Sequence, residues 1–150
     1  EHFLNVLKFE TKACTTGFQQ EGYLLPPISF MNGIHIKLTK FFKSKNMKLQ
    51  SLKDYQNVII RLKRIPTQID EVLILLKLGV DSSKTHANES IFRTKEQLQR
   101  LQVRPEASEF YEIFKNMRNN LPNIDISYIE SMQSDAKTII RENVLPAFKK

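Results

Sequence analysis

Residues 51–80, SLKDYQNVIIRLKRIPTQIDEVLILLKLGV, have the strongest pattern in the sequence. Their apolar side chains recur every three or four positions, which places them on one face of a helix. Ser51 is expected to cap the first turn, and Gly79 is expected to end the helical stretch. Pro66 lacks an N–H and crowds the turn before it, so it either kinks one long helix or starts a second. The stretch therefore predicts two packed helical segments, a kinked helical hairpin.

The remaining sequence predicts a mainly α protein, with residues 1–150 forming a single partial domain. Residues 1–20 show only one end of a helix. Residues 22–48 are expected to be extended, with at most a short strand, because they contain two prolines, an Asn-Gly turn and alternating Ile34, Ile36 and Leu38. Residues 51–150 are expected to be helical. Capping boxes at residues 94–97 and 127–130 predict two helix starts, and Pro146 is expected to kink or end the last helix.

The positive charge is concentrated in one segment. The chain has a net charge of +7, and residues 22–64 contain nine lysines and arginines against one acid, Asp54. A solvated face accounts for such a cluster, and an acidic partner is the alternative. No recognised nucleic-acid motif accompanies it, so nucleic acid is the least favoured partner.

The sequence was also searched for a membrane span, a signal peptide, disulfide bonds and a glycosylation site. No apolar run approaches the roughly 20 residues that a membrane span needs, and the N-terminus does not have the pattern of a signal peptide. Because the chain begins without Met, we expect a processed or excised fragment. A single cysteine, Cys14, excludes an internal disulfide framework without fixing a secretory or cytoplasmic location. Asn88 begins an Asn-Glu-Ser sequon, which is a candidate N-glycosylation site only in a secreted protein.

No complete active site is found in the sequence. His86-Ala-Asn-Glu89 matches the start of an H-x-x-E-H zinc motif, but Ser90 replaces the second histidine, so a polar surface histidine is favoured over a metal ligand. Cys14 and His35 lack an orienting third group for nucleophilic catalysis. The Asn32-Gly33-Ile34-His35 cluster is the most suggestive local feature, since a turn glycine beside a histidine can line a ligand pocket; an ordinary tight turn is the alternative. No catalytic, metal or cofactor residue is therefore assigned.

Three blocks of the sequence share their order with a known family. They are GYLLPPISFMNGIHIKL, the stretch 51–80, and EFYEIFKNM followed by TIIRENVLPAFKK. They resemble the family's "YLLP…GG-x-H", "DYENYLARLRAIPxYLDQVIxLLRxGI", "SPFYxPF" and "AIxxxVLPAYxxL" patterns. The chain thus resembles domain-of-unknown-function family 885, found in bacteria and animals, from about residue 18 to its end. It departs from the family in residues 81–88, which replace a Gly- and Pro-containing connection, and at Asn32, where the family has a second glycine.

The resemblance implies the N-terminal part of a larger α-helical protein similar to zinc metallopeptidases. The family's H-E-x-x-P-G-H-H motif, in which two histidines would hold zinc and the glutamate would activate water, lies downstream of the matched region. On this basis the chain is expected to be non-catalytic, to form part of a peptide-substrate cleft with His35 as the substrate-binding candidate, and to pair with a C-terminal half that carries the zinc. The alternative is a non-enzymatic helical interaction module from a truncated gene product, binding through exposed apolar helix faces.

Overall fold

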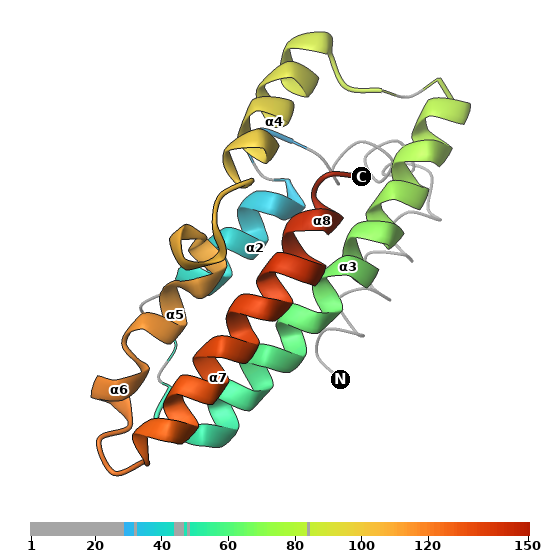
Figure 1. The fold of residues 1–150 in the computed structure, drawn as a ribbon. Coiled ribbons are helices and arrows are strands. Elements are labelled where there is room, and N and C mark those ends of the chain that lie inside the picture. Colours follow the sequence, from blue (N-terminus) through green and yellow to red (C-terminus); the bar gives the residue numbers. More distant parts are fainter. Residues whose placement is uncertain (1–28, 32, 44–46, 48, 84) are drawn as a thin grey trace.

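The computed structural model describes residues 29–31, 33–43, 47, 49–83 and 85–150, and all of their regular structure is helical. Two long rods dominate the fold. One is α3, and the other is formed by α7, the π-helical turn η3 and α8, which follow one another directly (Figure 1). The elements are α2 (Ile34–Lys43), α3 (Leu52–Asp81), α4 (Asn88–Arg100), η1 (Pro105–Ala107), η2 (Glu109–Tyr111), α5 (Glu112–Lys115), α6 (Met117–Asn120), α7 (Ile126–Ile139), η3 (Ile140–Val144) and α8 (Leu145–Ala147).

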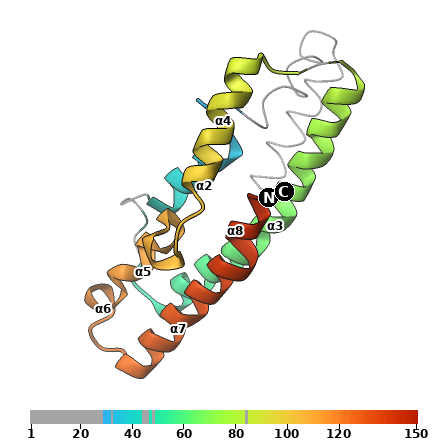
Figure 2. The same ribbon diagram turned by 45° about the horizontal axis from the view of Figure 1, so that its top comes forward.

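The two rods pack side by side and run in the same direction (Figure 1). From the end of α3 the chain crosses to α4, which runs back along the other side of the molecule, and α2 lies next to α4 (Figure 2). The helical prediction is therefore confirmed for the described residues. None of their helices is sufficiently long and apolar to cross a membrane.

Helix α3 begins as its sequence predicts. The Ser51 hydroxyl accepts a hydrogen bond from the Asp54 backbone N–H at 3.2 Å, and the Asp54 carboxylate accepts one from the Ser51 N–H at 2.9 Å. This reciprocal capping box satisfies two N–H groups that a helix start would otherwise leave unpaired. The hydrogen bonds made by its carboxylate hold the pKa of Asp54 below its usual range, with the Ser51 side chain as the main cause.

The two segments predicted on either side of Pro66 form one helix of 30 residues. Proline in a helix interior removes a backbone hydrogen bond and costs about 3 kcal/mol or more, so other contacts must hold the helix together here. Those contacts come from the apolar face, because Leu62, Ile65 and Ile69 on either side of the proline are all buried.

The helix also continues through the buried Gly79, where it was expected to end, and stops at Asp81. Ser83 beyond it takes the positive φ of 57° that a terminal glycine would otherwise supply.

The prediction of an extended segment over residues 22–48 is wrong for Ile34–Lys43, which form α2. Residues 34, 36 and 38 alternate, but buried His35, Thr39 and Phe42 have helical spacing of four and three. The helix buries that face against η2 and α5. Residues 1–28, including the predicted helix end, the prolines and Cys14, lie outside the described part of the chain.

Both helix starts predicted in the C-terminal half are displaced. Helix α4 begins at Asn88, and Thr94 is an interior residue whose hydroxyl donates to the Ser90 carbonyl at 2.8 Å. Helix α7 begins at Ile126, because the Asp125 carboxylate accepts from the Ser127 N–H at 3.0 Å and so supplies the cap two residues earlier than expected. In keeping with the expectation for Pro146, the last helix ends one residue beyond it.

An aromatic core joins α2, α3, the turns around residue 110 and the last helix. The Phe110 ring lies 5.4 Å from that of Phe42 in an edge-on arrangement and 5.8 Å from that of Phe148 in a stacked one. The fully buried Tyr55 contacts Phe114, and its hydroxyl accepts a hydrogen bond from the Asn120 amide at 2.9 Å. Burial raises the pKa of the Tyr55 hydroxyl. This core fixes the position of α2 relative to residues 105–111, and that arrangement creates the site described next.

Candidate functional site

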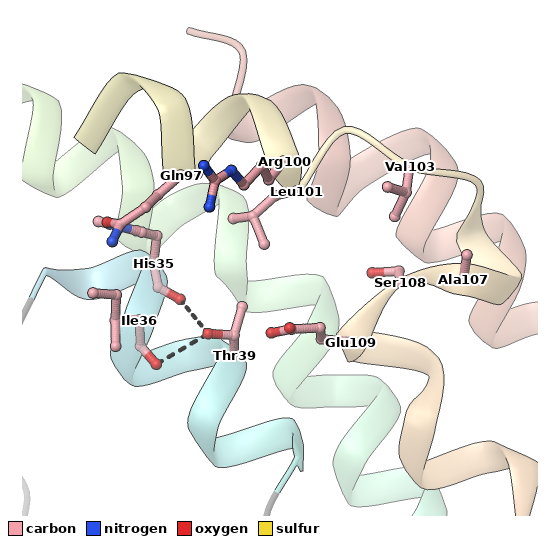
Figure 3. A pocket seen from close by; sticks show the side chains of 10 residues that line it. All are labelled: His35, Ile36, Thr39, Gln97, Arg100, Leu101, Val103, Ala107, Ser108 and Glu109. Atoms are coloured by element: carbon pink, nitrogen blue, oxygen red, sulfur yellow. Dashed lines mark hydrogen bonds between the residues drawn. The ribbon is translucent and has the colours of Figure 1, made fainter. Parts of the chain in front are cut away.

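A cavity of about 300 Å³ lies between α2, the end of α4 and the two 3-10 turns η1 and η2 (Figure 3). Four separate elements contribute to it, and the residues that line it are His35, Ile36, Thr39, Gln97, Arg100, Leu101, Val103, Ala107, Ser108 and Glu109. Its volume is at the lower end of the range for small-ligand pockets. It is a concave surface with both charged and apolar walls.

His35, the substrate-binding candidate, forms part of this wall, but it is almost fully buried, with 3% of its surface exposed. Its Nε2 lies 2.9 Å from the Gln97 Oε1, while the Gln97 Nε2 donates to the Phe30 carbonyl at 3.0 Å. Because an amide oxygen only accepts, this arrangement assigns the ring hydrogen to Nε2 of His35. The ring therefore ties α2 to α4 and holds the cavity wall in place. Its contact with a substrate stays a prediction.

Gly33 is required by the position of that ring. A Cβ atom at residue 33 would lie 2.7 and 2.8 Å from the His35 Cε1 and Nδ1, and 2.6 Å from the Ser29 carbonyl oxygen. The Gly33 N–H donates to the same carbonyl at 2.8 Å. Glycine at residue 33 thus lets the backbone approach the histidine closely, as a side chain there would not, while Asn32 of the predicted Asn-Gly turn lies outside the described residues.

Polar groups on the opposite wall come from residues 108 and 109. Ser108 is 2% exposed, and its Oγ accepts a hydrogen bond from the Phe110 N–H at 3.3 Å. Glu109 pairs with Lys43 of α2 at 2.7 Å, and this carboxylate raises the pKa of the lysine. Both Ser108 and Glu109 direct their oxygen atoms toward α2 (Figure 3). Of Glu106, Glu109 and Glu112, which are spaced three residues apart in this region, only Glu109 lines the cavity.

The other sequence candidates are not part of this cavity. Asn88 is exposed at the first residue of α4, so the sequon is accessible on the surface. His86 lies in the connection between α3 and α4. Within the described ranges no three His, Cys, Asp or Glu side chains gather in a geometry that would hold a metal ion.

The sequence did not reveal Thr39, Gln97, Arg100 or Ser108 as site residues. His35 and Gln97 are 62 positions apart, and no single motif contains both, so only the packing of α4 on α2 brings them together. One local signal was present: the spacing of His35 and Thr39 is that of one helical face.

Comparisons with known proteins yield no family model, no curated protein and no solved structure that matches this chain. The resemblance to family 885 therefore stays a prediction that depends on the quoted blocks alone.

Proposed function

We propose that this chain is the non-catalytic, N-terminal part of a protein resembling the zinc-dependent peptidases of family 885, and that it forms one wall of a peptide-substrate cleft. One observation supports the proposal: described parts of the blocks that resemble the family lie next to one another. His35 and Ile36 of α2 and Glu109, the first residue of a later block, line the same cavity. Helix α3 and the block ending at residue 150 form the two rods that pack side by side.

Zinc enters the proposal only as a group bound by the parent protein. The described side chains provide no cluster of ligands for it, so the zinc would be held by the downstream histidine motif that the resemblance implies. When bound, such an ion polarises a carbonyl and activates water. The part proposed for this chain is to bind and orient the peptide at the cavity beside His35. We also propose that the described helices are part of a larger metallopeptidase-like α-helical domain, and that α3 is kinked at Pro66.

The decisive experiment is to sequence the parent transcript beyond the codon for Lys150 and to assay the encoded protein. Several hundred further codons with a paired-histidine motif, and peptide hydrolysis that is lost on chelation and restored by zinc, are the expected result. A stop codon soon after Lys150, or a full-length product without zinc-dependent hydrolysis, would overturn the proposal.

Exposed apolar side chains favour a second candidate, a helical interaction module. At the far end of α3, Ile74 and Leu78 are 62% and 49% exposed, and at the start of α4, Ile91 and Phe92 are 47% and 59% exposed. Large apolar side chains exposed on helices in this way would be available for contacts with another protein. For this candidate, light scattering on the purified chain should show a monodisperse species that unfolds cooperatively; aggregation relieved only by the downstream half would favour the peptidase part instead.

The positively charged surface of α2 and α3 suggests which peptides the proposed cleft would prefer. Lys37 and Lys40 are exposed on α2, and the Arg61 guanidinium lies 5.2 Å from the centre of the Phe41 ring, between α2 and α3. This positive charge would attract acidic peptides. Charge reversal of Lys37 and Lys40 is expected to reduce the preference of the parent enzyme for acidic over neutral peptides, and an unchanged preference would count against the idea. Retention on nucleic acid that falls steeply with salt would instead indicate the least favoured partner.

A further inference from the structure

The cavity beside α2 contains one positive charge that no carboxylate balances. Its acidic residue, Glu109, is already paired with Lys43 at 2.7 Å. Arg100 forms no ion pair with any residue in the described part of the chain. Its exposed side chain extends from the end of α4, beside Gln97 (Figure 3). A guanidinium has a planar fork of N–H donors that matches the two oxygens of a carboxylate.

A buried hydroxyl adds a second donor to the same cavity. The Ser108 Oγ accepts from the Phe110 N–H, but the structure records no acceptor for the hydrogen of this hydroxyl among the described residues. Ser108 is 2% exposed, and its oxygen points toward α2 across the cavity (Figure 3). A buried donor without an acceptor is unfavourable. An acceptor atom on a ligand in the cavity would satisfy it.

The remaining residues of the cavity wall indicate which other chemical groups the ligand has besides this acceptor atom. Ile36, Leu101, Val103 and Ala107 present apolar side chains to the same space. The polar Thr39 does not compete for the ligand as a donor, because its hydroxyl already donates to the carbonyls of its own helix, at 2.9 Å to His35 and 3.1 Å to Ile36. The donors available to a ligand are therefore Arg100, Ser108 and the second N–H of the Gln97 amide, beside an apolar surface, and among them only Arg100 carries a charge.

We infer that this cavity is a binding site for an organic carboxylate with an apolar side chain, about the size of an acylated amino acid. The Arg100 guanidinium binds the carboxylate, the Ser108 hydroxyl donates to the ligand, and the apolar wall contacts its side chain. His35 positions Gln97 and α2 through its hydrogen bond to the Gln97 side chain. Carboxylate binding at Arg100 does not require zinc; only the identification of the ligand as the end of a peptide rests on the proposed function.

The test is calorimetric titration of the full chain with N-acetyl-leucine, with N-acetyl-leucinamide, and with an acetylated tetrapeptide that ends in leucine with a free carboxylate. The amide has the same apolar side chain but no charge. We expect the acid to bind about tenfold or more tightly than the amide, since a charge-assisted hydrogen bond distinguishes them. Equal binding of acid and amide, or no binding of either at millimolar concentration, would overturn the inference.

Variants separate the site from the general positive charge of the chain. Arg100→Gln is expected to remove the preference for acid over amide, and Arg100→Lys to retain part of it, because lysine keeps the charge without the fork. Arg118→Gln is the matched control, since Arg118 is exposed on α6 and does not line the cavity. Circular dichroism and thermal unfolding establish that each variant is folded. Equal loss in Arg100→Gln and Arg118→Gln would refute the assignment.

The tetrapeptide distinguishes the two sources of the carboxylate. If it binds at least as tightly as N-acetyl-leucine, the ligand is a peptide end, and the site belongs to the proposed cleft. If N-acetyl-leucine binds and the tetrapeptide does not, the carboxylate site stands and its ligand is a free small molecule. In that case the substrate cleft fails while this inference holds.

Discussion

The replacement of Gly33 by alanine is the sharpest test of how the cavity wall is held. The added Cβ would lie 2.7 and 2.8 Å from two atoms of the His35 ring, whereas ordinary contact begins at 3.4 Å, so the ring must move by about 0.6 Å or more. The Ser29 carbonyl at 2.6 Å must also move, which disturbs its hydrogen bond from the Gly33 N–H. Forcing extra atoms into a packed site typically costs about 1–3 kcal/mol, and we expect Gly33→Ala to reduce the free energy of unfolding by that amount.

A double-mutant cycle identifies the source of this cost. His35→Ala alone removes the hydrogen bond to Gln97 and leaves the amide oxygen without its partner, which should cost about 1–3 kcal/mol. It also removes both ring atoms that the new Cβ would meet. The double variant Gly33→Ala/His35→Ala should therefore be more stable than the sum of the two single changes predicts, by about 0.5 kcal/mol or more.

Urea unfolding of the four proteins, followed by circular dichroism, measures the free energies in this cycle. A titration of each variant with N-acetyl-leucine then reports whether the wall still shapes the cavity. Strictly additive effects would refute the argument, and so would a cost of Gly33→Ala below about 0.5 kcal/mol, the usual range of a surface substitution. The clash would then be relieved by backbone movement without displacement of the ring.

Three further predictions concern the helices that support the site. The Leu62 side chain has no exposed surface, so Leu62→Ala is expected to lower the free energy of unfolding in urea by about 2–5 kcal/mol. Ile74 is 62% exposed, and Ile74→Ala should change this free energy by no more than about 0.5 kcal/mol. Similar losses for the two variants would mean that α3 does not bury the face assigned to it. Ser51→Ala should remove the cap of α3 and reduce stability by about 1 kcal/mol, with Ser134→Ala on the exposed surface of α7 as the control. Hydrogen bonds to the caps hold the pKa values of Asp54 and Asp125 below their usual range, mainly through Ser51 and Ser127. A carboxyl group with a lowered pKa in the folded state stabilises the fold above the pKa of the unfolded chain, so this contribution is complete above about pH 4 and is lost as the pH falls through the folded-state pKa values. The double variant Asp54→Asn/Asp125→Asn should therefore lose less stability between neutral and acidic pH than the parent chain. An unchanged dependence of the free energy of unfolding on acidic pH would contradict the assignment.

Helix α3 could be predicted from the sequence because its signals are local. The apolar period and the Ser51 cap lie within the helix itself, and both are realised in the structure. The end of α3 could not be predicted in the same way, since Gly79 is compatible with both a stop and a buried interior position. Its helical continuation depends on surroundings that one segment does not reveal.

The extended prediction for α2 shows why a short apolar pattern is ambiguous. Ile34, Ile36 and Leu38 satisfy a period of two, while Ile34, Leu38 and Phe42 satisfy a period of four. The aromatic contact between Phe42 and Phe110, 68 residues away, stabilises the helical alternative. A prediction from residues 34–43 alone therefore lacked the interaction that decides the conformation.

The candidate site depends on such distant contacts throughout. Arg100 ends α4, and Ser108 precedes η2, so neither residue has a neighbour in the sequence that suggests a ligand. The aromatic core places η2 against α2, and the His35–Gln97 hydrogen bond holds α4 beside the same helix. If the core and this hydrogen bond create the cavity, then substitutions of Phe110 should weaken carboxylate binding together with stability, whereas Arg100→Gln should weaken binding alone. That difference separates the residues that build the site from the one that binds the ligand.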